Sequence, residues 1–137
     1  MKILILCETS NEIAGRFRAQ GHNVTSCDIL PNDVDQTNHW QGDVMQLLEM
    51  LPDDSVDLII AHPPCTALAV SGNAWYGQGM AKHEKRLEAM RWTEKLWRLC
   101  KRKGKRVAFE NPVGVLGHTS MGKATQYIQP WQHGHPE

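Results

Sequence analysis

The sequence lacks the glycine patterns that cradle phosphate groups. Its 137 residues contain no G-x-G-x-x-G and no Walker lysine motif, so neither a dinucleotide nor a triphosphate is the expected ligand. No apolar run is long enough to span a membrane, and the apolar start is too short for a secretory signal. The formal net charge is zero, so no overall field draws the chain to nucleic acid or membrane. These absences favour a cytoplasmic protein without a membrane partner.

Cysteine is scarce and unpaired in this sequence. There are four cysteines, and none belongs to a C-x-x-C pair: Cys7, Cys27, Cys65 and Cys100. Their spacing fits neither a zinc site nor a disulfide framework. All but Cys65 fall in or beside apolar segments, as small buried hydrophobic residues do. His133 and His135 lack a third ligand and do not predict a metal site. The pattern predicts a reduced, intracellular chain.

Apolar runs alternate with helical patterns along the chain. Strands are expected at residues 3–7, 23–27, 39–41, 56–61 and 106–109, and the longest helix at 82–103. Strands that alternate with helices predict βαβ units with right-handed crossovers. We therefore expect one α/β domain over residues 1–137, with a doubly wound, mostly parallel five-stranded sheet in the order 3-2-1-4-5. The glycine-containing segment 66–79 is expected to be a mobile loop.

Two of these strands are followed directly by residues that carry chemistry. Pro63-Pro64-Cys65 comes after the run 56–61, and Glu110-Asn111-Pro112 comes after the short run 107–109. In open parallel sheets, ligands bind at the carboxyl ends of the strands. A thiol and a carboxylic acid at this edge can attack and protonate an electron-poor heterocycle. The alternatives are a buried structural thiol for Cys65 and a salt-bridged acid for Glu110.

Two aspartates lie where a nucleoside-type ligand would be held. Asp28 closes the second strand, at the position from which an acid commonly binds ribose hydroxyls, and Asp43 holds the matching place after the third strand. Each could instead be only a helix cap or a turn former. S-adenosylmethionine carries no phosphate and needs no glycine loop, so it fits this sequence better than a nucleotide.

These pieces, in this order, resemble the DNA cytosine-5 methyltransferase family. The matching residues are Pro63-Pro64-Cys65 with the following Ser71-Gly72, then Glu110-Asn111-Pro112, and the strand-end acids Asp28 and Asp43. A small phage or prophage-type branch is most similar, with Cys7-Glu8 after the first strand and Gln129-Pro130-Trp131 near the end. The similarity covers most of the chain and implies a Rossmann-like methyltransferase fold.

The resemblance implies methylation of cytosine C5 in DNA with S-adenosyl-L-methionine as cofactor. Cys65 would add to C6 of the base, and Glu110 would donate a proton or hydrogen bond near N3. The residues implied to bind the cofactor are Cys7, Glu8, Ser10, Asp28, Ile29, Asp43 and Pro63. Those implied to contact the base are Pro64, Ser71 and Asn111.

The sequence also departs from the family. Asn11 stands where the first turn of the family has a glycine, and the later strands and the target-recognition domain are missing. We therefore expect a minimal enzyme that acts on single-stranded DNA, or one completed by a homodimer or a complementing subunit. The main alternative is an inactive binding module derived from a methyltransferase. An amino-methyltransferase is a weaker alternative, because His62-Pro63-Pro64-Cys65 lacks the required acid or amide and the aromatic residue.

Two further features have open interpretations. Trp75 and Tyr76 follow Cys65 in the chain and could stack on a base or close the loop onto the body. The basic stretch 95–106 fits a solvated helix end whose cations suit the macrodipole, or a patch that faces phosphates.

Overall fold

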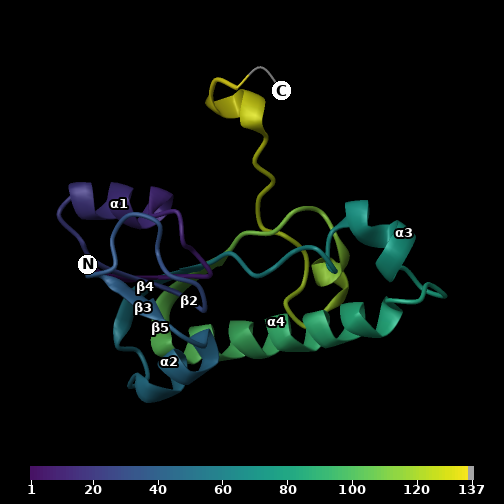
Figure 1. Cartoon of the computed structure of the whole chain (residues 1–137), viewed down its shortest axis with the longest axis horizontal. Coiled ribbons are helices and arrows are strands. Elements are labelled where there is room, and N and C mark those ends of the chain that lie inside the picture. Colours follow the sequence, from purple (N-terminus) through teal and green to yellow (C-terminus); the bar gives the residue numbers. More distant parts are fainter. Residues whose placement is uncertain (136–137) are drawn as a thin grey trace.

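The computed structural model describes residues 1–135 as an α/β fold built on one parallel sheet (Figure 1). The sheet has five strands in the order β3-β2-β1-β4-β5, which confirms the predicted order and the doubly wound topology. The strands are β1 (Lys2–Leu6), β2 (Asn23–Asp28), β3 (His39–Gln41), β4 (Val56–Ala61) and β5 (Gly104–Phe109). The helices are α1 (Glu12–Ala19), α2 (Val44–Met50), α3 (Asn73–Tyr76) and α4 (His83–Lys103), with 3-10 turns η1 (Val70–Gly72), η2 (Val115–His118) and η3 (Pro130–His133).

Alternating side chains of the sheet fill two separate apolar layers. Leu4 and Leu6 of β1 face α2 and α4, where they join Leu48 and Leu96 in the larger cluster. Ile3 and Ile5 point to the opposite side and pack with Ala14 of α1. Because successive residues of a strand face opposite sides, a strand buried on both faces is a continuous apolar run, as β1 is. Figure 1 shows α1 on one side of the sheet and α2 and α4 on the other.

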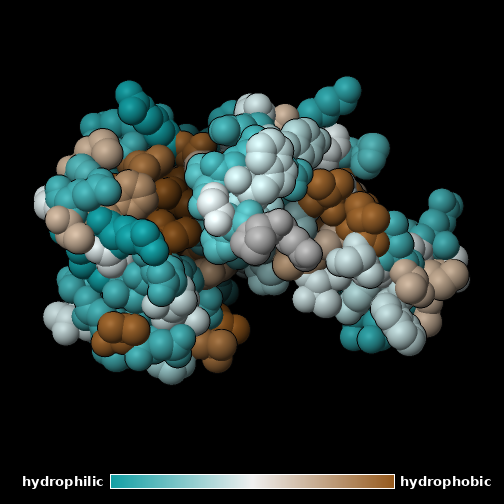
Figure 2. Space-filling view, turned by 90° about the horizontal axis from the view of Figure 1, so that it is seen from above, coloured by the Kyte–Doolittle hydropathy of each residue, from teal (hydrophilic) through white to brown (hydrophobic). Residues whose placement is uncertain are grey.

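The α1 side of the sheet is only partly covered. Leu58 and Ile60 of β4 belong to the smaller cluster but are only partly buried, and their register partners on β5, Arg106 and Ala108, are exposed. Figure 2 looks onto this side of the molecule and shows hydrophobic residues at the surface. Among residues 1–135, no strand pairs with the outer edge of β5. The fold therefore leaves one apolar area and one strand edge open.

The segment 66–79, expected to be a mobile loop, is not irregular throughout, and its mobility stays a prediction. It contains η1 and α3, and Arg86 of α4 holds it through hydrogen bonds. The guanidinium donates to the carbonyls of Ala67 at 2.6 Å and Ala69 at 3.1 Å, and to Oδ1 of Asn73 at 2.8 Å. Gly72 has no room for a side chain, because a Cβ would lie 2.6 Å from the carbonyl oxygen of Thr66. Glycine here permits close packing.

The C-terminal part runs along the body and then leaves it. Residues 122–135 are all exposed, and η3 stands apart on the α1 side of the sheet (Figure 1). Tyr127, Ile128 and Trp131 each expose more than half of their surface. Within the described residues, no helix is both long enough and apolar enough to cross a membrane.

Candidate functional site

The two motifs leave the sheet side by side. The register pairs Ala61 at the end of β4 with Phe109 at the end of β5, and backbone hydrogen bonds extend one residue further. His62 N–H donates to the carbonyl of Leu6 at 3.1 Å, and Glu110 N–H donates to that of Ala61 at 3.0 Å. The chain thus places the residues that follow two neighbouring parallel strands at one edge, where the topology of such sheets puts ligands.

A side-chain hydrogen bond joins the two motifs directly. Nδ2 of Asn111 donates to the carbonyl oxygen of Pro63 at 3.0 Å. Asn111 Oδ1 is buried and has no hydrogen-bond partner among the described residues. This hydrogen bond fixes the segment that carries Glu110 against the segment that carries Cys65.

The segments beyond the two motifs are also paired. Val70 N–H donates to the carbonyl of Val113 at 2.9 Å, and Val115 N–H donates to that of Leu68 at 3.0 Å. Gly114 forms the bridge with Ala69 at the centre of this contact, and a Cβ at Gly114 would overlap the carbonyl of Leu68. Only glycine lets the two segments approach this closely.

Cys65 is half-buried at the start of a tight turn. Its carbonyl accepts hydrogen bonds from the N–H groups of Leu68 and Ala69, both at 2.9 Å. Pro63 is buried and Pro64 is exposed. Both prolines fix φ, so the backbone that leads into Cys65 is rigid. Ser71 lies exposed in η1, further along the same segment.

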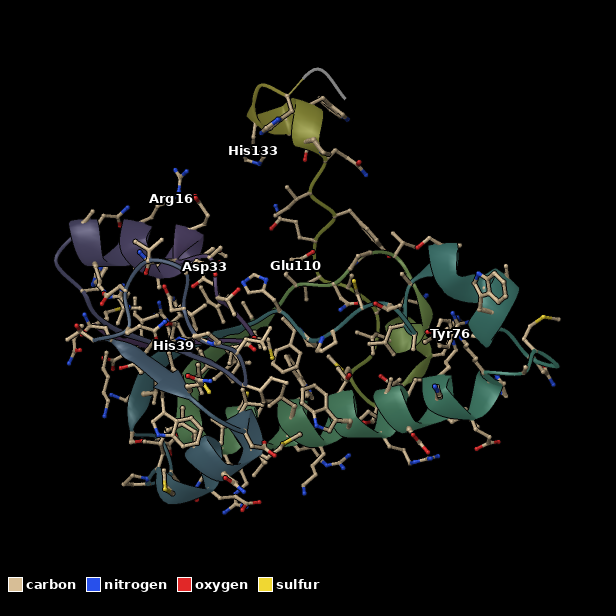
Figure 3. The ribbon with its side chains drawn as sticks, viewed as in Figure 1. Arg16, Asp33, His39, Tyr76, Glu110 and His133 are labelled. Carbon is tan, nitrogen blue, oxygen red and sulfur yellow. The ribbon has the colours of Figure 1, made fainter. Side chains whose placement is uncertain are left out.

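Glu110 is an accessible carboxylate with one close partner. Its side chain is 67% exposed, and Oε2 lies 3.4 Å from Nδ1 of His62. Figure 3 shows Glu110 in the middle of the molecule, between the α1 side and the α3 side. An exposed acid of this kind can contact a ligand that approaches from solvent, so the structure does not place Glu110 in a buried salt bridge.

The first turn keeps the backbone geometry that glycine would have. Asn11 has φ 63° and ψ 7°, in the left-handed region that asparagine tolerates better than most residues. Cys7 also has a positive φ of 60°. Such a value at a strand end is a strained conformation of a kind found at ligand sites. Asn11 therefore adopts a backbone conformation that glycine would also allow.

Glu8 caps α1 through its carboxylate. Oε1 accepts the N–H of Ile13 at 2.7 Å and Oε2 accepts the N–H of Ala14 at 3.2 Å. The side chain of Asn11, at the N-cap position, makes no capping hydrogen bond. The buried negative charge suits the helix N-terminus. Glu8 thus has a structural task of its own, and its contact with a cofactor stays a prediction.

A shallow cavity of about 230 Å³ opens beside this turn. Its lining comes from the first turn, the start of α1 and the residue after β4: Cys7, Glu8, Thr9, Ser10, Glu12, Ile13 and His62. Three of the residues predicted to bind the cofactor, Cys7, Glu8 and Ser10, are therefore gathered around one space. His62 also connects this cavity with Glu110.

The strand-end aspartates have different surroundings. Asp43 is the N-cap of α2, since its Oδ1 accepts the N–H of Met45 at 2.7 Å. Asp28 accepts the N–H of Leu30 through Oδ1 at 2.9 Å, and within residues 1–135 its Oδ2 has no hydrogen-bond partner. Ile29 exposes 70% of its surface next to Asp28. Each aspartate thus leaves its Oδ2 without a hydrogen-bond partner within residues 1–135, and Asp43 in addition caps a helix.

Three of the four cysteines have a raised pKa, which keeps them as protonated, unreactive thiols. Burial raises the pKa of Cys7 to about 12, and the Asp28 carboxylate adds to the shift. Burial likewise raises the pKa of Cys27 and of Cys100 to about 12. The charges of Cys7, Asp28 and Asp43 contribute to the shift at Cys27. The shifts at Cys7 and Cys27 show that these two thiols lie near the strand-end acids. Cys65 is the remaining thiol, in the segment that follows β4.

The aromatic residues after Cys65 and the basic stretch have structural partners. Trp75 and Tyr76 belong to α3, and the Lys82 ammonium lies 5.8 Å and 5.7 Å from their rings. Asp53 pairs with Lys103 at 2.9 Å and with Arg102 at 3.6 Å, and Asp57 pairs with Lys105 at 3.1 Å. This pairing favours the structural interpretation of the basic stretch over a phosphate-binding patch.

Sequence reasoning did not identify His62 and Arg86 as site residues. The signal for His62 was its position directly between β4 and the two prolines. The signal for Arg86 was its place three residues before Ala89, in line with the apolar stripe of Ala89, Thr93 and Leu96. A cation on that stripe indicates a buried hydrogen-bonding role.

Comparisons with models of known families, with characterised proteins and with solved structures found no match. The structure itself shows a Rossmann-like α/β fold with a thiol and a carboxylate in the segments that follow β4 and β5. The resemblance to cytosine-5 methyltransferases depends on those residues alone.

Proposed function

We propose that this protein transfers a methyl group to C5 of cytosine in DNA through a covalent adduct at Cys65. The observation that carries the proposal is the hydrogen bond from Asn111 to Pro63, which ties the Cys65 segment to the Glu110 segment at the carboxyl edge of the sheet. A nucleophile and an acid have to act on the same ring in this reaction. Two motifs held together support that use better than either residue alone.

The chemistry assigns one task to each residue. The Cys65 thiolate adds to C6 of the cytosine and makes C5 enamine-like, hence nucleophilic. Glu110 donates a proton or hydrogen bond near N3 as charge develops on the ring. After C5 is methylated, water takes the C5 proton, the Cys65 thiolate leaves C6, and N3 returns its proton to Glu110, which restores the aromatic ring. The rigid prolines before Cys65 limit the directions from which its sulfur can approach.

The first turn suits a cofactor that has no phosphate. S-adenosylmethionine, when bound, supplies an electrophilic methyl group on a positively charged sulfur. Asp28, with one free carboxylate oxygen, would hold ribose hydroxyls, and the exposed Ile29 would contact the base of the cofactor. The carboxylates of Glu8 and Glu12 at the cavity favour a cationic ligand.

Access of the enzyme to the cytosine ring decides whether single-stranded or duplex DNA is the better substrate. Chemistry on a base requires that the base leaves the stack or is already single-stranded. Trp75 exposes 66% of its surface on α3 and offers a face for stacking. We therefore propose single-stranded DNA as the preferred substrate, with duplex DNA methylated only when a partner chain supplies a base-reading surface.

A second candidate function is a binding module without catalysis. The observation that favours it is the open sheet, where Leu58 and Ile60 are only partly covered and the outer edge of β5 has no partner within residues 1–135. A protein of this kind would use the fold to associate and would leave Cys65 without a chemical role.

Transfer of labelled methyl groups separates the two candidates. The full chain is incubated with S-adenosylmethionine labelled at the methyl group and with single-stranded or duplex DNA. We expect label in 5-methylcytosine for the wild type, and none for Cys65→Ser. Glu110→Gln is expected to be slower by about 100-fold, as for loss of a general acid. Calorimetry that detects cofactor binding without any transfer would favour the binding module.

A further inference from the structure

A groove of about 490 Å³ lies along α4, the helix on the side of the sheet opposite α1 (Figure 1). It is lined by an aromatic ring, three cations and a hydroxyl group: Trp97, Arg98, Lys101, Arg102 and Ser120. Lys101 and Arg102 follow Arg98 by three and four residues, so the three exposed cations share one face of the helix. The groove therefore combines positive charge with an aromatic surface.

Arg98 and Lys101 have no firm anionic partner. Oε2 of Glu94 accepts the hydroxyl of Ser120 at 2.5 Å, whereas Nη1 of Arg98 lies 3.8 Å from the same oxygen. The side chain of Arg98 is 63% exposed, and an exposed ion pair of this length contributes little to stability. Lys101 forms no ion pair among the described residues, and its ammonium lies 5.5 Å from the centre of the Trp97 ring. Both cations can therefore turn to an anionic ligand at low cost.

The firm ion pairs of the basic stretch 95–106 lie outside the groove. Asp53 is 2.9 Å from Nζ of Lys103, whose side chain is 8% exposed, and 3.6 Å from Nη2 of Arg102. Asp57 pairs with Lys105 at 3.1 Å. The structural interpretation of the stretch thus applies to Lys103 and Lys105, and it leaves the cations of the groove available.

Trp97 connects the groove with the motif edge of the sheet. Its ring meets the ring of Phe109 edge-on, with the two centroids 5.0 Å apart. Phe109 is the last residue of β5 and directly precedes Glu110. The groove therefore lies next to the strand end from which the Glu110 segment leaves the sheet.

Single-stranded DNA is the ligand that fits this combination of groups. Proteins bind single strands with a positively charged groove that follows the phosphates and with aromatic rings that contact the bases. Because the formal net charge of the chain is zero, such binding has to come from a local group of cations. We propose that Arg98, Lys101 and Arg102 bind the phosphodiester backbone of single-stranded DNA, with Trp97 against a base. The choice of DNA rests on the proposed methyl transfer.

Fluorescence anisotropy tests the groove without any need for activity. The full chain is titrated into a labelled oligonucleotide of thymidines, without cofactor and at several salt concentrations. We expect the wild type to bind, and the double variant Arg98→Gln/Lys101→Gln to bind at least about 10-fold more weakly at low salt. The slope of log K against log salt concentration should fall by about 0.7 for each lost phosphate contact. An oligonucleotide of another sequence should show the same loss, because phosphates carry no sequence information.

A second double variant is the matched control. Arg16→Gln/Arg106→Gln removes the same charge from exposed positions on the opposite side of the sheet, and it should bind like the wild type. Equal weakening in both double variants would overturn the proposal, because only the net charge would then matter. No binding by the folded wild type would also overturn it, as would tighter binding of duplex than of single-stranded DNA.

The groove and the methyl transfer fail in different ways. If the wild type binds the oligonucleotide through the groove but transfers no methyl group, the enzyme proposal falls and the groove remains. If the wild type is active, Arg98→Gln/Lys101→Gln should raise the KM for single-stranded DNA. A KM and an affinity equal to those of the wild type would overturn the groove and leave the enzyme proposal intact.

Discussion

At the scale of single residues, the acids at the carboxyl edge of the sheet differ in how many of their carboxylate oxygens already accept hydrogen bonds. Both oxygens of Glu8 accept backbone N–H groups of α1, and Asp43 caps α2. Asp28 and Asp43 each use only Oδ1, but Asp28 accepts from Leu30 in a short turn and does not cap a helix. Substitution of Glu8 or Asp43 should therefore act first on stability, by about 1 kcal/mol for a lost cap. Substitution of Asp28 should act first on binding.

Asp28→Ala is predicted to weaken S-adenosylmethionine binding by about 1–3 kcal/mol, the range for losing a charged hydrogen-bond acceptor. Asp28→Asn keeps an oxygen for the N–H of Leu30 and should weaken binding similarly while it preserves the turn. Isothermal titration calorimetry measures the affinity. Glu49→Ala, which removes an exposed carboxylate from α2, is the control. Equal affinity in Asp28→Ala and the wild type would remove Asp28 from the site.

The four cysteines are predicted to differ in their reaction with iodoacetamide. A thiol whose pKa is about 12 is ionised in only about one molecule in ten thousand at pH 8, and the thiolate is the reactive form. Because a raised pKa keeps Cys7, Cys27 and Cys100 protonated at this pH, the half-buried Cys65 should be alkylated first. Mass spectrometry of peptides gives the order, and early labelling of Cys7 would contradict it.

At the scale of elements, the strand order and the positions of both motifs could be predicted. The side-chain hydrogen bonds that hold the site segments in place could not. The three-residue strand 39–41 was expected between the loop 32–38 and Gly42-Asp43, and β3 has these bounds. The role of Arg86 depends on carbonyls 17 and 19 residues away. Likewise, Glu8 acts on amides five and six residues ahead. Neither pairing follows from local patterns.

Substitution of Arg86 is predicted to release the segment that follows Cys65. Arg86→Leu leaves the carbonyls of Ala67 and Ala69 without their donor, and each buried unpaired group costs about 1–3 kcal/mol. We expect the free energy of unfolding to fall and chymotrypsin to cut faster at Trp75 and Tyr76. Urea unfolding and timed proteolysis measure these effects. If Arg86→Leu behaves like Arg91→Leu, a change on the exposed face of α4, Arg86 does not hold the segment.

At the scale of the whole molecule, the open side of the sheet predicts association. Half-covered Leu58 and Ile60 lie beside the exposed Ala108 of β5, whose outer edge has no partner within residues 1–135. Exposed edges and apolar areas favour contact with a second chain. We expect light scattering at micromolar concentration to show a dimer, and Ala108→Asp to be monomeric. A wild type that stays monomeric would mean that this surface is not an interface.

The most direct test of the central claim is covalent trapping of Cys65 on DNA that contains 5-fluorocytosine. Fluorine at C5 cannot leave as a proton does, so the adduct cannot eliminate after methyl transfer. With S-adenosylmethionine and single-stranded DNA, the wild type should form a complex that survives denaturing electrophoresis. The complex should be absent without the cofactor and in Cys65→Ser. No complex from folded, cofactor-saturated wild type on single-stranded or duplex DNA would contradict the proposed methyl transfer.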